Sequence, residues 1–437
     1  MARMNEQGGV LAALREDRAL RAVLLLCLTL RLLYSFAVFP IIGERLMWKG
    51  VDDKYDEIAR NLLQGEGYVI RAGDAPNLIT PPGYVYFLAL LYRLTGAEVN
   101  EGVRVRILQP LLDTATCFLV FLLGALVFRR RGLAILAALG WALYPQAIVY
   151  TARVAPESLF ILLLTGMMYT LARYRAAGRT ADLVLCGLLW AAAALVKEKV
   201  ILLPPLLILL ALPGMGAGLR RRGARTLLLL LAMAAPLTPW LARQYAVTGM
   251  IVPITMRSGR ALNQGMNESF AGADRWVEEL PDRLKENERR ERERAEAALG
   301  EEERLERARA GARDERGLIG KALARIAGDP GAFARAFLVK SAAFWYYGQP
   351  RVIWGNVAIQ IPLLLLAIGG YVRGWRRYDL KPFLAVTVYF VVVHALTIVR
   401  MRYSLPIMPE TMLVAVSLVL SLRGGREGPE ATAPRRG

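Results

Sequence analysis

The sequence predicts an all-α polytopic membrane protein, and two observations lead to that prediction. Hydrophobic residues make up 55% of the 437-residue chain and the mean hydropathy is +0.35, which is too apolar for a soluble protein. The apolar residues also fall into separate runs of roughly the 20 residues that a helix needs to cross a bilayer. Spanning strands would appear as short alternating segments, which these runs are not. We expect about ten transmembrane helices, within a range of about 9–12, over 20–42, 104–128, 132–152, 156–173, 182–197, 200–217, 226–245, 352–372, 382–399 and 405–422.

The net charge of +19 is distributed as a signal of membrane topology. Arginine clusters recur at alternate connections between the predicted spans, and short positively charged loops stay on the cytoplasmic side. This placement favours orientation and contact with anionic lipids over binding of nucleic acid. Both termini are then cytoplasmic. The clusters lie at 15–21, 129–131, 173–179, 220–225, 373–377 and 423–426.

The same topology divides the chain into three regions. Residues 1–245 form an N-terminal transmembrane module whose first outer loop is 43–103, and residues 352–437 form the C-terminal helices and a cytoplasmic tail. Between them, 246–351 is a large outer segment. Its part 274–316 is extremely charged, with acid–base pairs four residues apart that are typical of a solvated helix. The short connections at 153–155, 198–199 and 400–404 also face outward.

The first outer loop carries an acidic pair, Asp52 and Asp53, followed by a short amphipathic segment. The apolar stripe within Lys54–Gln64 predicts a helix that Gly65 closes. A second apolar stretch from Pro81 to Leu94 is too short to span and is expected to lie in the interface. Helix capping explains one of the two aspartates. The second aspartate leaves a catalytic base as the alternative.

Cysteine and histidine usage gives no indication of a metal site. The three cysteines, Cys27, Cys117 and Cys186, each fall within a predicted span, where a thiol acts as a small apolar group. The chain has a single histidine, His394, and no metal-ligand spacing. We therefore expect no cofactor; a divalent metal is compatible with the sequence but not indicated.

Ionisable residues near the outer ends of the predicted spans predict a polar cavity that opens outward. Charge within a membrane is costly, so such groups usually pair or serve function. Cations at this position suit an anionic, lipid-linked donor, because they stabilise the departing phosphate oxygen. His394 has two interpretations, a structural histidine or a substrate contact. The candidate cations are Lys54, Lys197, Lys199, Arg243, Arg260, Arg400 and Arg402, and the acids include Asp113, Glu157 and Glu410.

Several short motifs, in their order along the chain, resemble one known superfamily. They are Asp52-Asp53-Lys54-Tyr55, Pro81-Pro82-Gly83-Tyr84, Pro156-Glu157-Ser158-Leu159, Pro239-Trp240-Leu241-Ala242-Arg243, Ser258-Gly259 and Arg402-Tyr403-Ser404-Leu405-Pro406. With them the chain resembles the bacterial GT-C membrane glycosyltransferases, the superfamily of lipid A aminoarabinose transferases and protein O-mannosyltransferases. The likeness extends over most of the chain.

The resemblance implies a GT-C bundle that takes a sugar from a polyprenyl-phosphate donor. The acceptor, a lipid, a glycan or a protein, would meet it at the outer membrane face, and the displacement would invert the anomeric carbon. Asp52, or its neighbour Asp53, would be the base. Relatives often place this acid where the chain has Val51, so the assignment between the two stays open. The resemblance also implies that Lys54, Tyr55 and the candidate cations bind the donor phosphate, that Arg71 replaces a cation usually found before the Pro-Gly-Tyr element, and that Tyr84, Glu157 and His394 line the substrate cavity.

Two other functions compete with this interpretation. A flippase for lipid-linked sugars would carry out no chemistry, and transporters of that kind tend to show inverted repeats with charges near the midplane. No repeat is apparent in this sequence. A membrane assembly partner could use the charged segment 274–316, but that function leaves the acidic pair at 52–53 unexplained.

Overall fold

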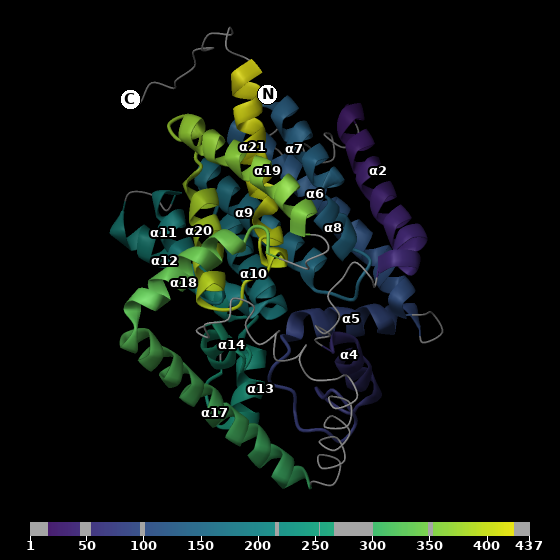
Figure 1. Ribbon diagram of the computed structural model, residues 1–437, viewed down its shortest axis with the longest axis vertical. Coiled ribbons are helices and arrows are strands. Elements are labelled where there is room, and N and C mark those ends of the chain that lie inside the picture. Colours follow the sequence, from purple (N-terminus) through teal and green to yellow (C-terminus); the bar gives the residue numbers. More distant parts are fainter. Residues whose placement is uncertain are drawn as a thin grey trace.

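The computed structural model describes residues 16–43, 54–96, 101–214, 218–252, 254–265, 300–347 and 353–423. Within these ranges the chain is helical and forms no strand, as the sequence predicts (Figure 1). The acidic pair Asp52 and Asp53, and 274–299 of the charged segment, lie outside the described residues.

Each predicted span corresponds to one helix or to two consecutive helices. By length and composition, four described helical segments could cross a membrane: Arg18–Ile41, Gly102–Phe128, Ile353–Gly374 and Met401–Leu422. A fifth forms if a bent pair is counted as one span, and three more apolar helices are shorter. The bundle helices are α2 (Arg18–Leu33) with its continuation η1 (Tyr34–Gly43), α6 (Glu101–Phe128), α7 (Arg131–Leu143), α8 (Pro145–Tyr150), α9 (Glu157–Ala177), α10 (Thr180–Val196), α11 (Pro204–Ala211) with η3 (Leu212–Gly214), α12 (Leu219–Ala234), α13 (Thr238–Thr248), α19 (Ile353–Gly374), α20 (Lys381–Leu396) and α21 (Met408–Arg423).

Proline divides several of the predicted spans. Pro145 is the first residue of α8. Pro236 lies between α12 and α13, Pro239 lies in the first turn of α13, and the axes of these two helices differ by 55°. A proline inside a helix removes a backbone donor and clashes with the preceding turn, so each break falls where the sequence places one. The predicted spans 132–152 and 226–245 are therefore broken rather than straight.

Contacts between distant segments gather the basic connections at one end of the bundle. Arg131 donates two hydrogen bonds to the carboxylate of Asp17, at 2.6 and 2.7 Å, and Arg175 binds Asp379 in the same way, at 2.6 and 2.9 Å. At this end α2 begins and α21 finishes (Figure 1). The predicted outer elements lie at the opposite end. They are α4 (Tyr55–Gln64), α5 (Pro82–Thr95), α14 (Ser258–Gly265), α17 (Glu301–Gly328) and α18 (Pro330–Ala343).

The first outer loop folds into the two helices that its sequence predicts. Tyr55, Ile58 and Ala59 bury the apolar stripe of α4, and Gly65 ends the helix at a φ of 85°, a conformation that favours glycine. The helix packs against α5, which lies across the end of the bundle (Figure 1). Gly83 allows α5 to approach α10 closely, because a Cβ there would stand 2.8 Å from the backbone of Leu195.

Two of the predicted cavity charges lie inside the bundle instead. Asp113 of α6 pairs with the guanidinium of Arg31 in α2, and both side chains are fully buried. Arg31 also donates to the carbonyls of Trp141 and Ala142 in α7, at 3.1 and 2.9 Å. This pair joins three helices, since a charge in a bundle interior needs a partner. Glu410 of α21 is likewise buried. Neither Asp113 nor Glu410 lines the outer cavity. The prediction that the ionisable residues of the spans form one outward-facing set is therefore wrong for these two.

Candidate functional site

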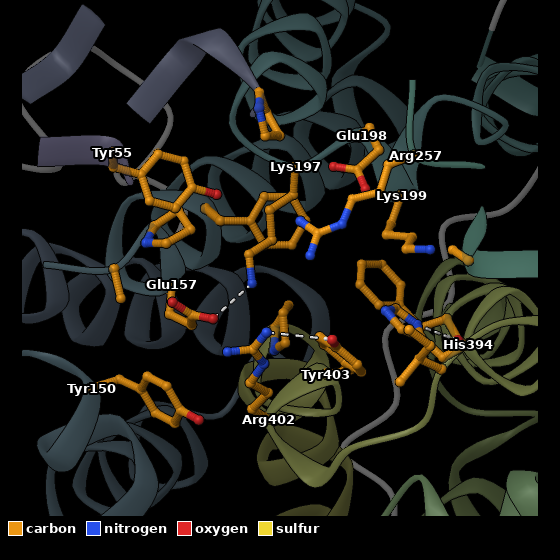
Figure 2. A pocket seen from close by; sticks show the side chains of 18 of the residues that line it. Tyr55, Tyr150, Glu157, Lys197, Glu198, Lys199, Arg257, His394, Arg402 and Tyr403 are labelled. Atoms are coloured by element: carbon orange, nitrogen blue, oxygen red, sulfur yellow. Dashed lines mark hydrogen bonds and ion pairs between the residues drawn. The ribbon is translucent and has the colours of Figure 1, made fainter. Parts of the chain in front are cut away.

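A cavity of about 130 Å³ lies on the side of the bundle that carries α4 and α14, and Figure 2 shows its lining from close by. Helix ends from distant parts of the chain meet there: the start of α4, the start of α9, the end of α10, the end of α20 and the turn before α21. The segment before α14 completes its wall. Its lining residues include Tyr55, Tyr150, Arg153, Glu157, Phe160, Lys197, Glu198, Lys199, Arg257, Phe390, His394, Arg402 and Tyr403.

The central ion pair of the cavity follows from a helical hairpin. Helices α9 and α10 are consecutive and antiparallel, so the first residue of α9, Glu157, lies beside the residue that follows α10, Lys197. The Lys197 ammonium donates to Oε1 of Glu157 at 2.9 Å and lies 5.6 Å from the ring centre of Phe160. The other oxygen, Oε2, has no hydrogen-bond partner among the described residues. Glu157 is therefore held in place and keeps one oxygen for a ligand.

Positive charge dominates the rest of the lining. Five cationic side chains face the cavity against two carboxylates. Figure 2 shows the side chains of Lys197, Arg257 and Arg402 pointing toward its centre. Among the residues that the structure describes, Arg402 makes one long hydrogen bond, 3.4 Å, to the hydroxyl of Tyr403, and Lys199 makes one of 3.3 Å to Thr397. Guanidinium groups have five donors and ammonium groups three, so most donor capacity of these two side chains is open to an anion.

An aromatic stack closes one side of the cavity. The ring of His394 lies 4.7 Å from that of Tyr403 at an interplanar angle of 25°, and Phe390 and Phe344 pack within 5.8 and 5.6 Å. Nδ1 of His394 lies 2.8 Å from the carbonyl oxygen of Phe390, one helical turn earlier. The imidazole is thereby fixed in position and orientation.

A buried brace holds Tyr55 at the opposite side. Tyr55 packs edge to face on Tyr84, with ring centres 5.1 Å apart, and Gln109 of α6 donates to the Tyr84 hydroxyl at 2.7 Å. The Gln109 amide also lies 2.7 Å from the carbonyl of Arg153, which fixes the lining loop before α9. Burial raises the pKa of Tyr84 far above its ordinary value, so this hydroxyl stays protonated. Tyr84 thus supports the cavity from behind Tyr55 rather than lining it.

The structure brings together six residues that the sequence assigns to the site. Tyr55, Glu157, Lys197, Lys199, His394 and Arg402 line one cavity although they span 348 positions of the chain, from 55 to 402.

Five of the candidate cations do not line it. Lys54 pairs with Glu57 at 3.1 Å, and Arg71 is exposed in the loop after α4. The guanidinium of Arg243 lies over the rings of Tyr68 and Trp240, 5.1 and 4.8 Å from their centres. Arg243 also donates to the carbonyl of Asn77 at 3.1 Å, so it holds the loop after α4. The other two are Arg260, which is exposed on α14, and Arg400, which is buried next to the cavity wall.

The comparisons with known proteins agree with this architecture. Residues 80–240 match the model of the dolichyl-phosphate-mannose-protein mannosyltransferase family. The fold is similar to that of the crystal structure of the Archaeoglobus fulgidus oligosaccharyltransferase in its apo form, with a TM-score of 0.52 and 13% identity. That similarity covers 95% of this chain, which spans about half, 53%, of the archaeal one. The chain has the GT-C membrane glycosyltransferase fold. The resemblance stated from the motifs is thus confirmed, and the chain is a multi-pass membrane protein. No curated protein matches the sequence.

The residues matched by the family model supply only part of the cavity lining. It includes the lining from Pro81 to Lys199, and with it the ion pair of Glu157 and Lys197. Tyr55, His394 and Arg402 lie outside the matched segment. They complete the cavity wall because the tertiary structure brings them next to it.

Sequence reasoning missed two cations that line the cavity, Arg153 and Arg257. Each carried a usable signal. Arg153 lies in the short connection 153–155 that the topology places outward, and Arg257 directly precedes the Ser258-Gly259 motif. Arg260 was chosen instead, yet α14 directs it to Glu315, 3.7 Å away. Arg257 precedes α14 whereas Arg260 lies within it, so the direction of each side chain depends on where the helix begins, which the sequence alone does not reveal.

Proposed function

We propose that the protein transfers a sugar from a polyprenyl-phosphate donor to an acceptor at the outer face of the cytoplasmic membrane. The observation that carries the proposal is the cation-rich cavity where the helices end, at the level expected for lipid headgroups. Lys199, Arg153, Arg257 and Arg402 would bind the donor phosphate there. Lys197 would contribute to the same field while it holds Glu157.

The proposed base is Asp52 or Asp53, and the position of Tyr55 supports it. Tyr55 lines the cavity, and the two aspartates precede it by three and two residues. A fully extended chain covers at most about 3.6 Å per residue, so neither Cα can be more than about 11 Å from that of Tyr55. In the proposed mechanism one of the two carboxylates lies in the cavity within that radius, where it would meet the acceptor.

The proposed reaction is an inverting displacement. The carboxylate takes the proton of the acceptor, whose freed electron pair attacks the anomeric carbon from the face opposite the phosphate. As that bond forms, the bond from the anomeric carbon to the phosphate oxygen breaks, and polyprenyl phosphate departs with the electron pair. Negative charge then grows on the leaving oxygen, where arginine and lysine stabilise the transition state more than the ground state.

The distribution of basic residues supports the proposed orientation. Arg131 and Arg175 lie at the end of the bundle opposite the cavity, with the start of α2 and the end of α21. Basic connections remain cytoplasmic, so the cavity would open to the outside and both termini would lie within the cell.

Asparagine substitution tests the mechanism, because it removes the basic carboxylate while conserving size. We expect one of Asp52→Asn and Asp53→Asn, and the double variant, to abolish transfer of radiolabelled sugar in membranes while donor binding persists. The matched control is Asp56→Asn, which alters a carboxylate of α4 that binds Arg60 and Tyr92 outside the cavity. Full activity of the double variant would refute the mechanism. Transport of lipid-linked sugar by an inactive chain would favour the flippase. Mass spectrometry of the copurifying lipid would identify the donor sugar.

A further inference from the structure

The one histidine of the chain is placed as part of a binding surface. His394 is 3% exposed, yet its ring contributes to the cavity wall opposite Tyr55 and Glu157 (Figure 2). Tyr403, Phe390 and Phe344 surround the imidazole, so its plane cannot turn without disturbing the stack. Its two nitrogens therefore have fixed and different surroundings.

The contact at Nδ1 determines the tautomer. Nδ1 lies 2.8 Å from the carbonyl oxygen of Phe390, and a carbonyl oxygen can only accept a hydrogen bond. Nδ1 must therefore carry a proton and donate it. In the neutral ring Nε2 is then unprotonated and offers a lone pair. The structure shows no hydrogen bond from the described residues to Nε2.

Burial and the neighbouring cations keep the ring neutral. Lys199 and Arg402 line the same cavity wall, and Tyr403, next to Arg402 in the sequence, stacks directly on the imidazole. A second proton would place an imidazolium beside these cations in a site that is largely removed from water, and like charges disfavour that state. Nε2 is consequently an uncharged acceptor in a wall whose other polar groups are mostly donors.

We propose that Nε2 of His394 accepts a hydrogen bond from a substrate hydroxyl and so helps to determine which substrate the cavity takes. This inference rests on the proposed function. A phosphate diester has no proton to donate, and the cations of the wall repel an ammonium group, which leaves a hydroxyl as the suitable donor. The hydroxyl belongs either to the transferred sugar or to the acceptor. In both cases His394 is a specificity-determining residue.

Nuclear magnetic resonance can read this nitrogen directly, because the full-length protein has a single histidine. In detergent, ¹⁵N-histidine labelling should show a protonated Nδ1 and a bare Nε2. The probes are citronellyl phosphate and its esters with mannose, glucose, galactose and 4-amino-4-deoxyarabinose. If the sugar supplies the hydroxyl, at least one ester should shift the Nε2 resonance upfield, whereas citronellyl phosphate should not. A protonated Nε2 in the free protein, or an equal shift with the sugar-free phosphate, would overturn the inference.

Substitutions separate the acceptor atom from the structural role of the ring. His394→Asn can still donate to the Phe390 carbonyl but has no atom in the position of Nε2, whereas the longer His394→Gln can place its amide oxygen near that position. Loss of one neutral hydrogen bond corresponds to a weakening of about 3–10-fold. If the sugar is bound, His394→Asn should weaken binding of the ester and not of citronellyl phosphate. If the acceptor is bound, it should leave ester binding unchanged and slow transfer to native membranes by the same factor.

Recovery in His394→Gln would exclude a purely structural cause. Binding and transfer at wild-type level in His394→Asn would overturn the inference and leave the proposed function intact. Absence of binding of every probe to the wild type would instead refute the proposed donor site, and the inference with it.

Discussion

A double-mutant cycle on Glu157 and Lys197 separates what this pair does for stability from what it does for function. The two groups lie 2.9 Å apart, and their side chains are 3% and 17% exposed. Lys197→Met removes the ammonium and leaves a buried carboxylate without its main partner. Glu157→Gln removes the carboxylate charge and leaves an ammonium that still reaches the cavity. The double variant removes both charges together.

The expected magnitudes follow from distance and burial. At 2.9 Å and an effective dielectric constant of about 20, the gross attraction is about 6 kcal/mol. Much of it offsets desolvation, and breaking a buried pair from one side costs about 3–5 kcal/mol. We expect a loss of that size for Lys197→Met. The loss for Glu157→Gln should be smaller, about 1–2 kcal/mol, because Lys197 keeps some access to water. The double variant should lie near the milder single variant, so the coupling energy should equal the loss for Lys197→Met, about 3–5 kcal/mol.

The free energy of unfolding can be measured by titration with sodium dodecyl sulfate in mixed micelles, and sugar transfer can be measured in parallel. Stability should largely recover in the double variant, whereas activity should not, because the cavity then lacks both a cation and a carboxylate. Strict additivity of the two stability losses would refute the coupling. Full activity of the double variant would show that the pair only supports the fold.

Three further substitutions test a close helix approach, a buried ion pair and a buried lysine. Gly83→Ala should lower the free energy of unfolding by about 1–3 kcal/mol, because its methyl group would meet the α10 backbone at 2.8 Å; an unchanged midpoint in the same titration would contradict that close approach. Arg31→Met should cost about 3–5 kcal/mol by leaving Asp113 buried alone, and Arg31→Met with Asp113→Leu should recover much of the loss; a double variant as unstable as the single would contradict the pairing. Burial lowers the pKa of Lys340 to about 8, below its ordinary 10.5. The unfolded chain therefore binds the extra proton between pH 8 and 10.5, and this group should make stability rise with pH across that window. Lys340→Met should flatten the rise, and parallel pH profiles for the two proteins would contradict the assignment.

Much of the architecture could be predicted because it depends on local signals. The apolar runs predict the bundle helices, and the stripe within α4 with Gly65 behind it predicts both the helix and its end. Glycine adopts a positive φ without strain, so its position reads directly as a helix terminus. The prolines at 236 and 239 likewise explain why one predicted span is bent.

The residues that line the cavity were harder to predict from the sequence. Whether a side chain faces the cavity depends on the direction in which its helix turns it and on the residues it contacts. Arg243 and Arg402 are both arginines near span ends, and the sequence does not distinguish them. In the fold, Arg243 lies over Tyr68 and Trp240, whereas Arg402 faces the cavity. Both guanidinium groups lie over a ring, that of Tyr403 for Arg402, but Arg243 is also held by the loop after α4, through Tyr68 and the carbonyl of Asn77. That is a property of the tertiary structure and leaves no local signal.

Depth in the bundle then distinguishes the two uses of charge in this protein. Arg31 and Asp113, deep in the bundle, satisfy each other and nearby carbonyls, because an unpaired charge there would be prohibitive. At the helix ends, Lys199 and Arg402 each make one long side-chain hydrogen bond among the described residues, to the hydroxyls of Thr397 and Tyr403, and neither bond is to a carboxylate. A cation at such a position raises the free energy of the folded protein when no anion is bound, and a bound anion offsets that cost. The geometry that makes the interior pair structural therefore makes the terminal cations available for a phosphate.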